Sequence, residues 1–177
     1  MKKALFLDRD GVINIEKNYL YKITDFEFIE GVFSSCKYFQ DKGYLLIVIT
    51  NQAGIARGKY TDNDFECLNE WMLEQFANHG VMITKVYYCP HHPEYTAICA
   101  CRKPSPGMII QAQKEFDLDL SKSLLVGDKE GDIQAGLNAQ IEHNILVRSG
   151  HRIDETSTAA RVIIDSIADL PEVYKVP

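Results

Sequence analysis

Two carboxylates lie one residue apart, at Asp8 and Asp10, directly after the apolar run 4–7. Residues two apart in an extended chain project to the same side, so these carboxylates should lie close together. An apolar run without polar alternation is typical of a central strand in a parallel sheet, which binds ligands at the carboxyl ends of its strands. Two adjacent carboxylates repel each other unless a cation such as Mg²⁺ lies between them. The pattern favours an active site over its alternative, a polar strand end that caps a turn.

A hydroxyl and two amides end a second apolar run, 45–49, as Thr50, Asn51 and Gln52. All three side chains can donate hydrogen bonds, and phosphate oxygens accept them well. A threonine at the end of a strand can also serve only as a turn residue, so the motif taken alone leaves both interpretations open.

Charged side chains follow two later segments of the chain. Asp128 comes directly after the apolar run 124–126 and adds another carboxylate for a cation. Asp132 could join it or could cap the N-terminus of a helix, and the sequence leaves both possibilities open. Lys103 precedes a proline, which forces an extended or turn conformation on it, so its ammonium group could meet a phosphate there.

Three cysteines and two histidines fall within residues 89–101. Cys89, Cys99 and Cys101 with one histidine form a Cys₃His set, which is an established tetrahedral zinc site. Because four protein ligands leave no position for water, such a zinc ion would be structural. The alternative is three ordinary thiols, and residue chemistry alone does not distinguish His91 from His92.

The composition describes an ordinary globular chain of 177 residues with 46% hydrophobic and 25% charged residues. This length suits one domain, 1–177, and no apolar stretch approaches the ~20 residues of a membrane helix. A net charge of −6 argues against nucleic acid as a partner. The apolar run after Lys2 and Lys3 is too short for a signal peptide, so we expect a cytoplasmic protein without a membrane or nucleic-acid partner, acting as a monomer.

Strand and helix patterns alternate along the chain and would position these groups. We expect strands at 3–7, 44–50, 86–89, 123–127 and 144–147, with helices at 32–42, 62–79, 107–116 and 132–138. This alternation indicates a three-layer, Rossmann-like α/β fold with a central parallel sheet. Residues 12–31 form an irregular excursion that is too short for a cap domain, which predicts a fairly open site.

The four chemical motifs, in this order, resemble the haloacid dehalogenase (HAD) superfamily of aspartate-dependent phosphatases. The resemblance covers the whole chain and implies that Asp8 attacks phosphorus, forming a phospho-aspartyl intermediate. It implies that Asp10 is the general acid and base, and that Thr50 and Lys103 stabilise the transferring oxygens. Mg²⁺ would be held by the Asp8 carboxylate, the Asp10 carbonyl and Asp128.

The cysteine loop, with the segments 51–58 and 127–129, resembles more closely the bacterial phosphatases of heptose 1,7-bisphosphate. That resemblance selects His91 as the fourth zinc ligand and implies removal of the C1 phosphate from D-glycero-D-manno-heptose 1,7-bisphosphate. The alternatives are a histidinol-phosphate phosphatase or an inactive binding module stabilised by zinc. The resemblance also implies a set of residues that contact the phosphorylated sugar: Glu16, Lys17, Asn18, Tyr19, Asn51, Gln52, Ala53, Arg57, Arg102 and Lys129.

Overall fold

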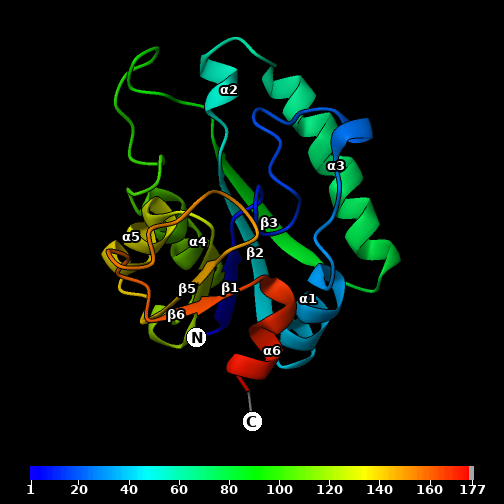
Figure 1. Cartoon of the computed structure of the whole chain (residues 1–177), viewed down its shortest axis with the longest axis vertical. Helices are drawn as coiled ribbons and strands as arrows, with labels where there is room; N and C mark the ends of the chain where they lie inside the picture. The colour runs from blue at the N-terminus through cyan, green and yellow to red at the C-terminus, as the bar shows by residue number, and fades with distance from the viewer. Residues whose placement is uncertain (176–177) are drawn as a thin grey trace.

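A six-stranded parallel sheet forms the centre of the molecule, in a computed structural model that describes residues 1–175. The strands lie in the order β3-β2-β1-β4-β5-β6 (Figure 1). The five expected strands are present, and β6, a strand of only three residues at the sheet edge, was not expected. Their bounds are β1 Lys3–Leu7, β2 Tyr44–Asn51, β3 Ile83–Cys89, β4 Leu124–Gly127, β5 His143–Val147 and β6 Val162–Ile164.

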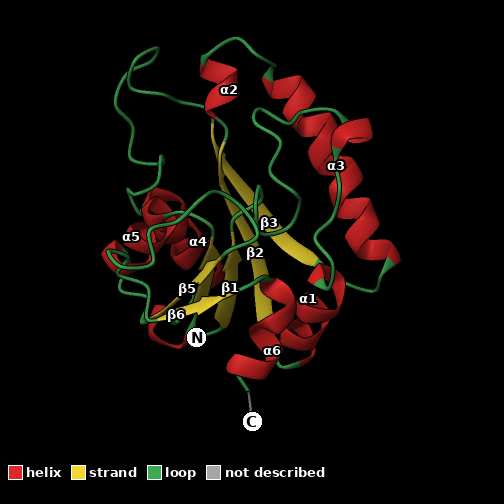
Figure 2. Ribbon diagram, viewed as in Figure 1, coloured by secondary structure: helices red, strands yellow, loops and turns green. Residues whose placement is uncertain are grey.

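Helices cover both faces of this sheet and give the expected three layers (Figure 2). On one side lie α1 Val32–Asp41, α3 Asp62–Asn78 and the short α6 Leu170–Val173. On the other side lie α4 Gly107–Phe116 and α5 Glu130–Asn138. The short α2 Ala53–Ala56 follows β2 directly, and 3₁₀ turns occupy Ile23–Asp25, Leu120–Lys122 and Ile167–Asp169. None of the helices in residues 1–175 is long and apolar enough to cross a membrane.

Alternate side chains of each central strand enter two separate hydrophobic cores. Leu5 and Leu7 of β1 join the core beneath α1 and α3, whereas Ala4 and Phe6 join the core beneath α4. Burial on both faces explains why β1 is apolar from Ala4 to Leu7, without the alternation of a half-exposed strand.

Local signals in the sequence set the bounds of the longest helix. Thr61 caps α3 in a capping box with Asp64, as its position before the helical pattern predicts. Gly43 and Gly80 lie beyond the ends of α1 and α3 with φ of 81° and 72°. Glycine adopts this left-handed conformation without strain, so both expected helix ends are confirmed.

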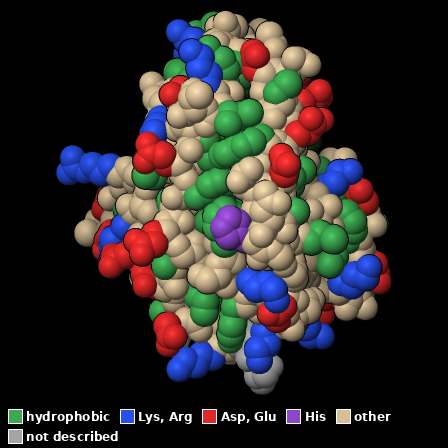
Figure 3. Space-filling view, turned by 90° about the vertical axis from the view of Figure 1, so that its right-hand side faces the viewer, with side chains coloured by type: hydrophobic (Ala, Val, Ile, Leu, Met, Phe, Trp, Pro, Cys, Tyr) green, Lys and Arg blue, Asp and Glu red, His purple; other side chains and the backbone are tan. Residues whose placement is uncertain are grey.

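The excursion 12–31 is irregular, as expected, but it is firmly packed. Phe26 and Phe28 lie against Trp71 of α3 with ring centroids 5.4 and 5.7 Å apart. Figure 3 shows apolar side chains running through the middle of the face on the α3 side, with charged groups mainly at its margins. This packing holds the excursion beside the carboxyl ends of the strands, so that it forms a wall of the site.

Candidate active site

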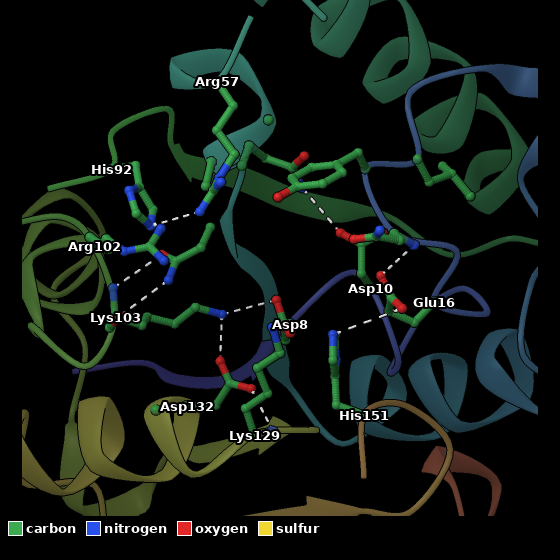
Figure 4. Close-up of a pocket in the computed structure, with 18 of the residues that line it drawn as sticks. Asp8, Asp10, Glu16, Arg57, His92, Arg102, Lys103, Lys129, Asp132 and His151 are labelled. Atoms are coloured by element: carbon green, nitrogen blue, oxygen red, sulfur yellow. Dashed lines mark hydrogen bonds and ion pairs between the residues drawn. The ribbon is translucent and has the colours of Figure 1, made fainter. Parts of the chain in front are cut away.

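The predicted catalytic groups meet where the strand order reverses, between β1 and β4. Asp8 and Asp10 follow β1, Thr50 lies near the end of its neighbour β2, and Asp128 follows β4 on the other side. A doubly wound parallel sheet binds its ligands at this point. A cavity of about 320 Å³ opens there and contains Asp8, Asp10 and Lys103 in its lining (Figure 4).

Lys103 crosses the site from the segment that follows the cysteine loop and binds two carboxylates. Its Nζ lies 2.9 Å from Asp8 Oδ1 and 2.6 Å from Asp132 Oδ1, and it also donates to the Ile49 carbonyl. Burial alone would lower the pKa of this ammonium, but Asp132 and Asp8 raise the pKa well above its usual value. Asn51 holds the Lys103 backbone with two hydrogen bonds, of 3.1 and 3.2 Å. Lys103 is therefore a fixed, protonated cation.

Three carboxylates beside Lys103 can hold a divalent cation. Asp8, Asp128 and Asp132 each bring an oxygen within 4.8 Å of the others. Within residues 1–175, the buried Asp128 Oδ1 has no hydrogen-bond partner. Burial and repulsion by Asp132 raise the pKa of Asp8 well above its usual value and that of Asp128 to about 6. An unpartnered buried carboxylate oxygen among crowded acids fits a hard cation such as Mg²⁺.

Asp132 orders the start of α5, although it is not the N-cap residue, because Lys129 is the N-cap and Asp132 is the third residue of the helix. Its Oδ2 accepts hydrogen bonds from the backbone N–H groups of Asp128 and Lys129, both at 3.1 Å, at the start of α5. Its Oδ1 binds Lys103. One carboxylate thus orders the start of the helix and holds the Lys103 ammonium group.

Asp10 lies in a network of hydrogen-bond donors that lowers its pKa in the protein without substrate. Its Oδ1 accepts from Arg9 and Asn14, each at 3.0 Å, and its Oδ2 accepts from Gln52 at 3.1 Å. Burial would raise the pKa of Asp10, but the Arg9 charge and the amides lower it below the usual value. Gln52 also donates to Thr50 Oγ1 at 2.8 Å and accepts from the Tyr60 hydroxyl. Thr50 still has its hydroxyl hydrogen to donate.

Sequence reasoning missed four members of the site. Arg9 stands between the two motif aspartates, and neither its charge nor its position predicts that only 2% of it is exposed. Asn14, four residues after Asp10, is the one with a local signal, since a turn at Gly11 brings it back. Tyr60 and His151 reach the site only through the fold. His151 contacts Asp128 from the segment after β5. The order of the motifs along the chain does not predict this contact.

The cysteine loop brings its four expected ligands together. Sγ of Cys89 lies 3.6 Å from Sγ of Cys99 and 3.0 Å from that of Cys101, while His91 Nδ1 lies 3.4 Å from Cys101 Sγ. A tetrahedral site with metal–ligand distances of about 2.0–2.3 Å has edges of about 3.3–3.8 Å, which the 3.4 and 3.6 Å spacings match. The 3.0 Å spacing between Cys89 and Cys101 is shorter than such an edge. Burial alone would raise the pKa of Cys99, but a hydrogen bond donated by the Arg102 backbone N–H lowers this pKa to about 6. The lowered pKa favours the thiolate form, which binds metal. The cluster can hold a metal ion.

The adjacent histidine faces away from this cluster. His92 Nε2 lies 3.4 Å from the Arg57 guanidinium, and His92 lines the main cavity. The choice of His91 over His92 therefore agrees with the geometry.

Nine of the ten residues expected to contact the sugar line the cavity, whereas Lys17 and the expected catalytic residue Thr50 do not. Lys17 pairs with Glu27 and is absent from the lining, while Thr50 lies beneath it behind Gln52. Tyr19 adopts a left-handed backbone with φ of 60°, which is strained for a bulky residue and typical of a functional site. The expected residues that do line it are Glu16, Asn18, Tyr19, Asn51, Gln52, Ala53, Arg57, Arg102 and Lys129.

Comparison with known proteins agrees with this geometry. A family model described as HAD-hydrolase-like matches residues 100–170. The chain is 54% identical over 145 residues to the D-glycero-alpha-D-manno-heptose-1,7-bisphosphate 7-phosphatase of Campylobacter jejuni, covering 82% of each chain. It is 44% identical to the beta-anomer 7-phosphatase of Yersinia pestis, over 97% of this chain and 95% of the relative. The chain belongs to the heptose-bisphosphate phosphatase family.

A solved member of this heptose-bisphosphate phosphatase family has the same fold. The D,D-heptose 1,7-bisphosphate phosphatase from B. bronchiseptica, complexed with magnesium and phosphate, superposes with a TM-score of 0.81 at 29% identity and covers 97% of both chains. The expected HAD fold and phosphatase class are confirmed. A histidinol-phosphate phosphatase and an inactive module are not favoured.

The relatives correct one sequence-based expectation. Both are named 7-phosphatases, so removal of the C1 phosphate is wrong for them. The sequence motifs identify the machinery that cleaves a phosphate ester, but they do not contain the orientation of a substrate that carries two.

Proposed function

We propose that this protein hydrolyses the C7 phosphate of D-glycero-D-manno-heptose 1,7-bisphosphate, in the synthesis of nucleotide-activated heptose. The observation that carries the proposal is the contact of Lys103 with Asp8 at 2.9 Å, at the floor of a cavity lined by further cations. Lys103 orients a buried nucleophile and supplies positive charge beside the position of the transferring phosphate. The names of the family members supply the sugar and the ester position.

Asp8 and Asp10 divide the chemistry between them. A carboxylate oxygen of Asp8 forms a bond to phosphorus while the bond from phosphorus to the sugar oxygen breaks. The phosphate dianion beside Asp10 would raise the pKa of this carboxyl, so that it takes up a proton when substrate binds and gives that proton to the leaving oxygen. As a carboxylate, Asp10 then takes a proton from the water that attacks the phospho-aspartyl group, and the bond between phosphorus and Asp8 breaks. Hydrogen bonds from Arg9, Asn14 and Gln52 hold the Asp10 carboxyl beside Asp8 in both steps.

Asp8, Asp128 and the backbone carbonyl of Asp10 are the groups that would hold Mg²⁺. When bound, this ion supplies charge neutralisation that lets an anionic nucleophile approach an anionic phosphate. The unpartnered Asp128 Oδ1 supports this assignment. Asp132, which belongs to the same acidic cluster, is engaged by Lys103 and by the start of α5.

Zinc at Cys89, His91, Cys99 and Cys101 would have a structural role. The residue after the last ligand is Arg102, whose Nη1 donates to the His91 carbonyl at 3.3 Å. Arg102 and Lys103 both line the cavity. The zinc loop would therefore hold two cations of the site in position.

We further infer that the protein works in the cytoplasm as a monomer with one cooperative domain. Its five cysteines are unpaired, which suits a reducing compartment. The proposed domain 1–177 extends two residues beyond the described ones. Light scattering should give the mass of one chain, and thermal unfolding should give one transition.

The test of substrate is a panel assayed with Mg²⁺ in excess. Both anomers of the heptose bisphosphate, a heptose 7-phosphate and histidinol phosphate would be compared by phosphate release, with products identified by NMR. We expect the bisphosphate to be turned over fastest, leaving the heptose 1-phosphate. Loss of phosphate from C1, or equal turnover of histidinol phosphate, would refute the proposed substrate.

A further inference from the structure

His151 contacts the carboxylate of Asp128 with both its backbone and its ring. The backbone N–H donates to Asp128 Oδ2 at 2.9 Å, and ring Nδ1 lies 2.6 Å from the same oxygen. The Asp128 side chain is fully buried, whereas 37% of the His151 side chain is exposed. One oxygen of Asp128 is thus held twice from the segment after β5, and Oδ1 has no partner in the part of the chain that the structure describes.

The backbone closes tightly around this held oxygen. A Cβ atom added to Gly150 would lie 2.1 Å from Asp128 Oδ2, and one added to Gly11 would lie 2.3 Å from it. Ser149 ties the two glycine segments together, since its hydroxyl donates to the Gly11 carbonyl at 2.7 Å. The carboxylate is therefore enclosed on its Oδ2 side.

The ring contact fixes which tautomer of His151 is present. Nδ1 must carry the hydrogen in order to donate to a carboxylate, so the neutral ring has Nε2 as its unprotonated nitrogen. Nε2 lies 3.8 Å from Glu16 Oε2, too far for a hydrogen bond. Figure 4 places His151 at the edge of the cavity, between Glu16 and the acidic cluster. Its close polar contact is the one with Asp128.

We infer that His151 is a positioning residue for the magnesium site, which holds Asp128 so that Oδ1 faces the cation. Metal-binding carboxylates are commonly oriented by such hydrogen bonds, and losing one typically weakens metal binding about 10–100-fold. The inference rests on the proposed Mg²⁺ site, but it does not depend on which phosphate ester is the substrate. Because the ring adds its bond to one that the backbone already makes, its contribution is separable by substitution.

The test measures binding of Mn²⁺, as a spin-active substitute for Mg²⁺, by EPR without any substrate. His151→Ala and His151→Phe remove the ring donor, and Phe keeps most of the ring volume. His151→Asn places an amide donor near the position of Nδ1. We expect the dissociation constant to rise about 10–100-fold for Ala and Phe, and to return to within about threefold of wild type for Asn.

Two controls separate positioning from general damage. Arg152→Gln changes the exposed neighbour and should bind Mn²⁺ like wild type, and Asp128→Asn defines the binding that occurs elsewhere. In EDTA all the His151 variants should unfold in one cooperative transition, because the backbone hydrogen bond persists. Ala and Phe should melt below Asn, because they lose a hydrogen bond to a buried carboxylate. Wild-type affinity in both Ala and Phe, or a loss that Asn does not restore, would overturn the inference. A failure of the substrate panel would leave this result unaffected.

Discussion

Asp132 Oδ1 lies 2.6 Å from Lys103 Nζ, while the other oxygen of the same carboxylate accepts from the backbone at the start of α5. The position of the catalytic cation is therefore coupled to the beginning of a helix. An asparagine in place of Asp132 would keep an oxygen that accepts from the backbone of the helix. Its neutral amide could not form an ion pair with the Lys103 ammonium group. The two functions of this side chain can be measured separately.

Asp132→Asn should lower kcat by about 10²-fold, because a small displacement of a catalytic group has an effect of that size. Asp132→Ala should lose the same activity and, in addition, about 1 kcal/mol of stability from the lost helix cap. Steady-state kinetics and urea unfolding of both variants would check this. Equal stability of the two variants would show that the cap contributes nothing.

Asp8→Asn should abolish turnover yet stabilise the metal-free protein at neutral pH. Burial and the neighbouring aspartates raise the pKa of Asp8 in the folded state. Below the unfolded-state pKa of about 3.9, the Asp8 carboxyl is protonated in both the folded and the unfolded protein and does not change the free energy of unfolding. At higher pH it ionises more readily in the unfolded protein, so it lowers the free energy of unfolding. In EDTA at pH 7, the variant should melt at a higher temperature than wild type, by about 2–4 °C for each kcal/mol gained in the free energy of unfolding. The difference should vanish by about pH 3.5.

Excess Mg²⁺ provides the control for this electrostatic argument. The cation should raise the melting temperature of wild type more than that of Asp8→Asn, since the variant lacks one ligand. An Asn variant that is less stable than wild type at pH 7 in EDTA would contradict the proposed repulsion among the buried carboxylates.

Gln52 should act mainly on kcat, because its amide donates to Asp10 and Thr50 from a buried position. Gln52→Leu removes both hydrogen bonds, and we expect kcat to fall by about 10²-fold with a smaller change in KM. Tyr60→Phe removes only the hydroxyl that binds the far side of the amide, so its effect should be smaller. A raised KM with unchanged kcat would instead assign Gln52 to ground-state substrate binding.

The sequence predicts those parts of the site that depend on short segments. Asp8, Thr50 and Asp128 each follow or end an apolar strand, so the parallel sheet alone brings them together. The contact of Tyr60 with Gln52 and that of His151 with Asp128 depend on how a loop folds back after a strand or short helix. The three-residue β6 and four-residue α2 are too short to leave a periodic pattern. Lys17 was expected from the family resemblance and has no local signal of its own, and it pairs with Glu27 away from the cavity lining.

Cys99→Ser should reduce the zinc content of the purified protein and lower its melting temperature. A loss of about 2 kcal/mol would correspond to about 4–8 °C for a chain of this size. Cys67→Ser is the matched control, because Cys67 is exposed and lies outside the cluster. Elemental analysis should give one zinc per chain for wild type and for the control. Protein purified without chelator that contains no zinc would refute the site.

Arg102 should distinguish a bisphosphate from a monophosphate. Its guanidinium lines the cavity and donates from Nη1 to the His91 carbonyl, a contact that leaves most of its N–H groups for a ligand. The second phosphate of the substrate is an anion that a monophosphate lacks, and guanidinium groups bind phosphate through paired hydrogen bonds. We expect Arg102→Ala to lower kcat/KM for the heptose bisphosphate about 10–100-fold more than for a heptose 7-phosphate, in line with about 1.5–3 kcal/mol for a charged hydrogen bond.

Lys17→Ala is the control for this experiment, since it removes one positive charge that pairs with Glu27 outside the cavity. Its kcat/KM should stay near wild type for both substrates, which would exclude a general effect of net charge. The ratio of the two kcat/KM values is the informative quantity, because disorder of the cysteine loop would lower both together. An unchanged ratio in Arg102→Ala would show that the second phosphate is bound elsewhere, with Arg57 and Lys129 as the remaining cations of the lining to test.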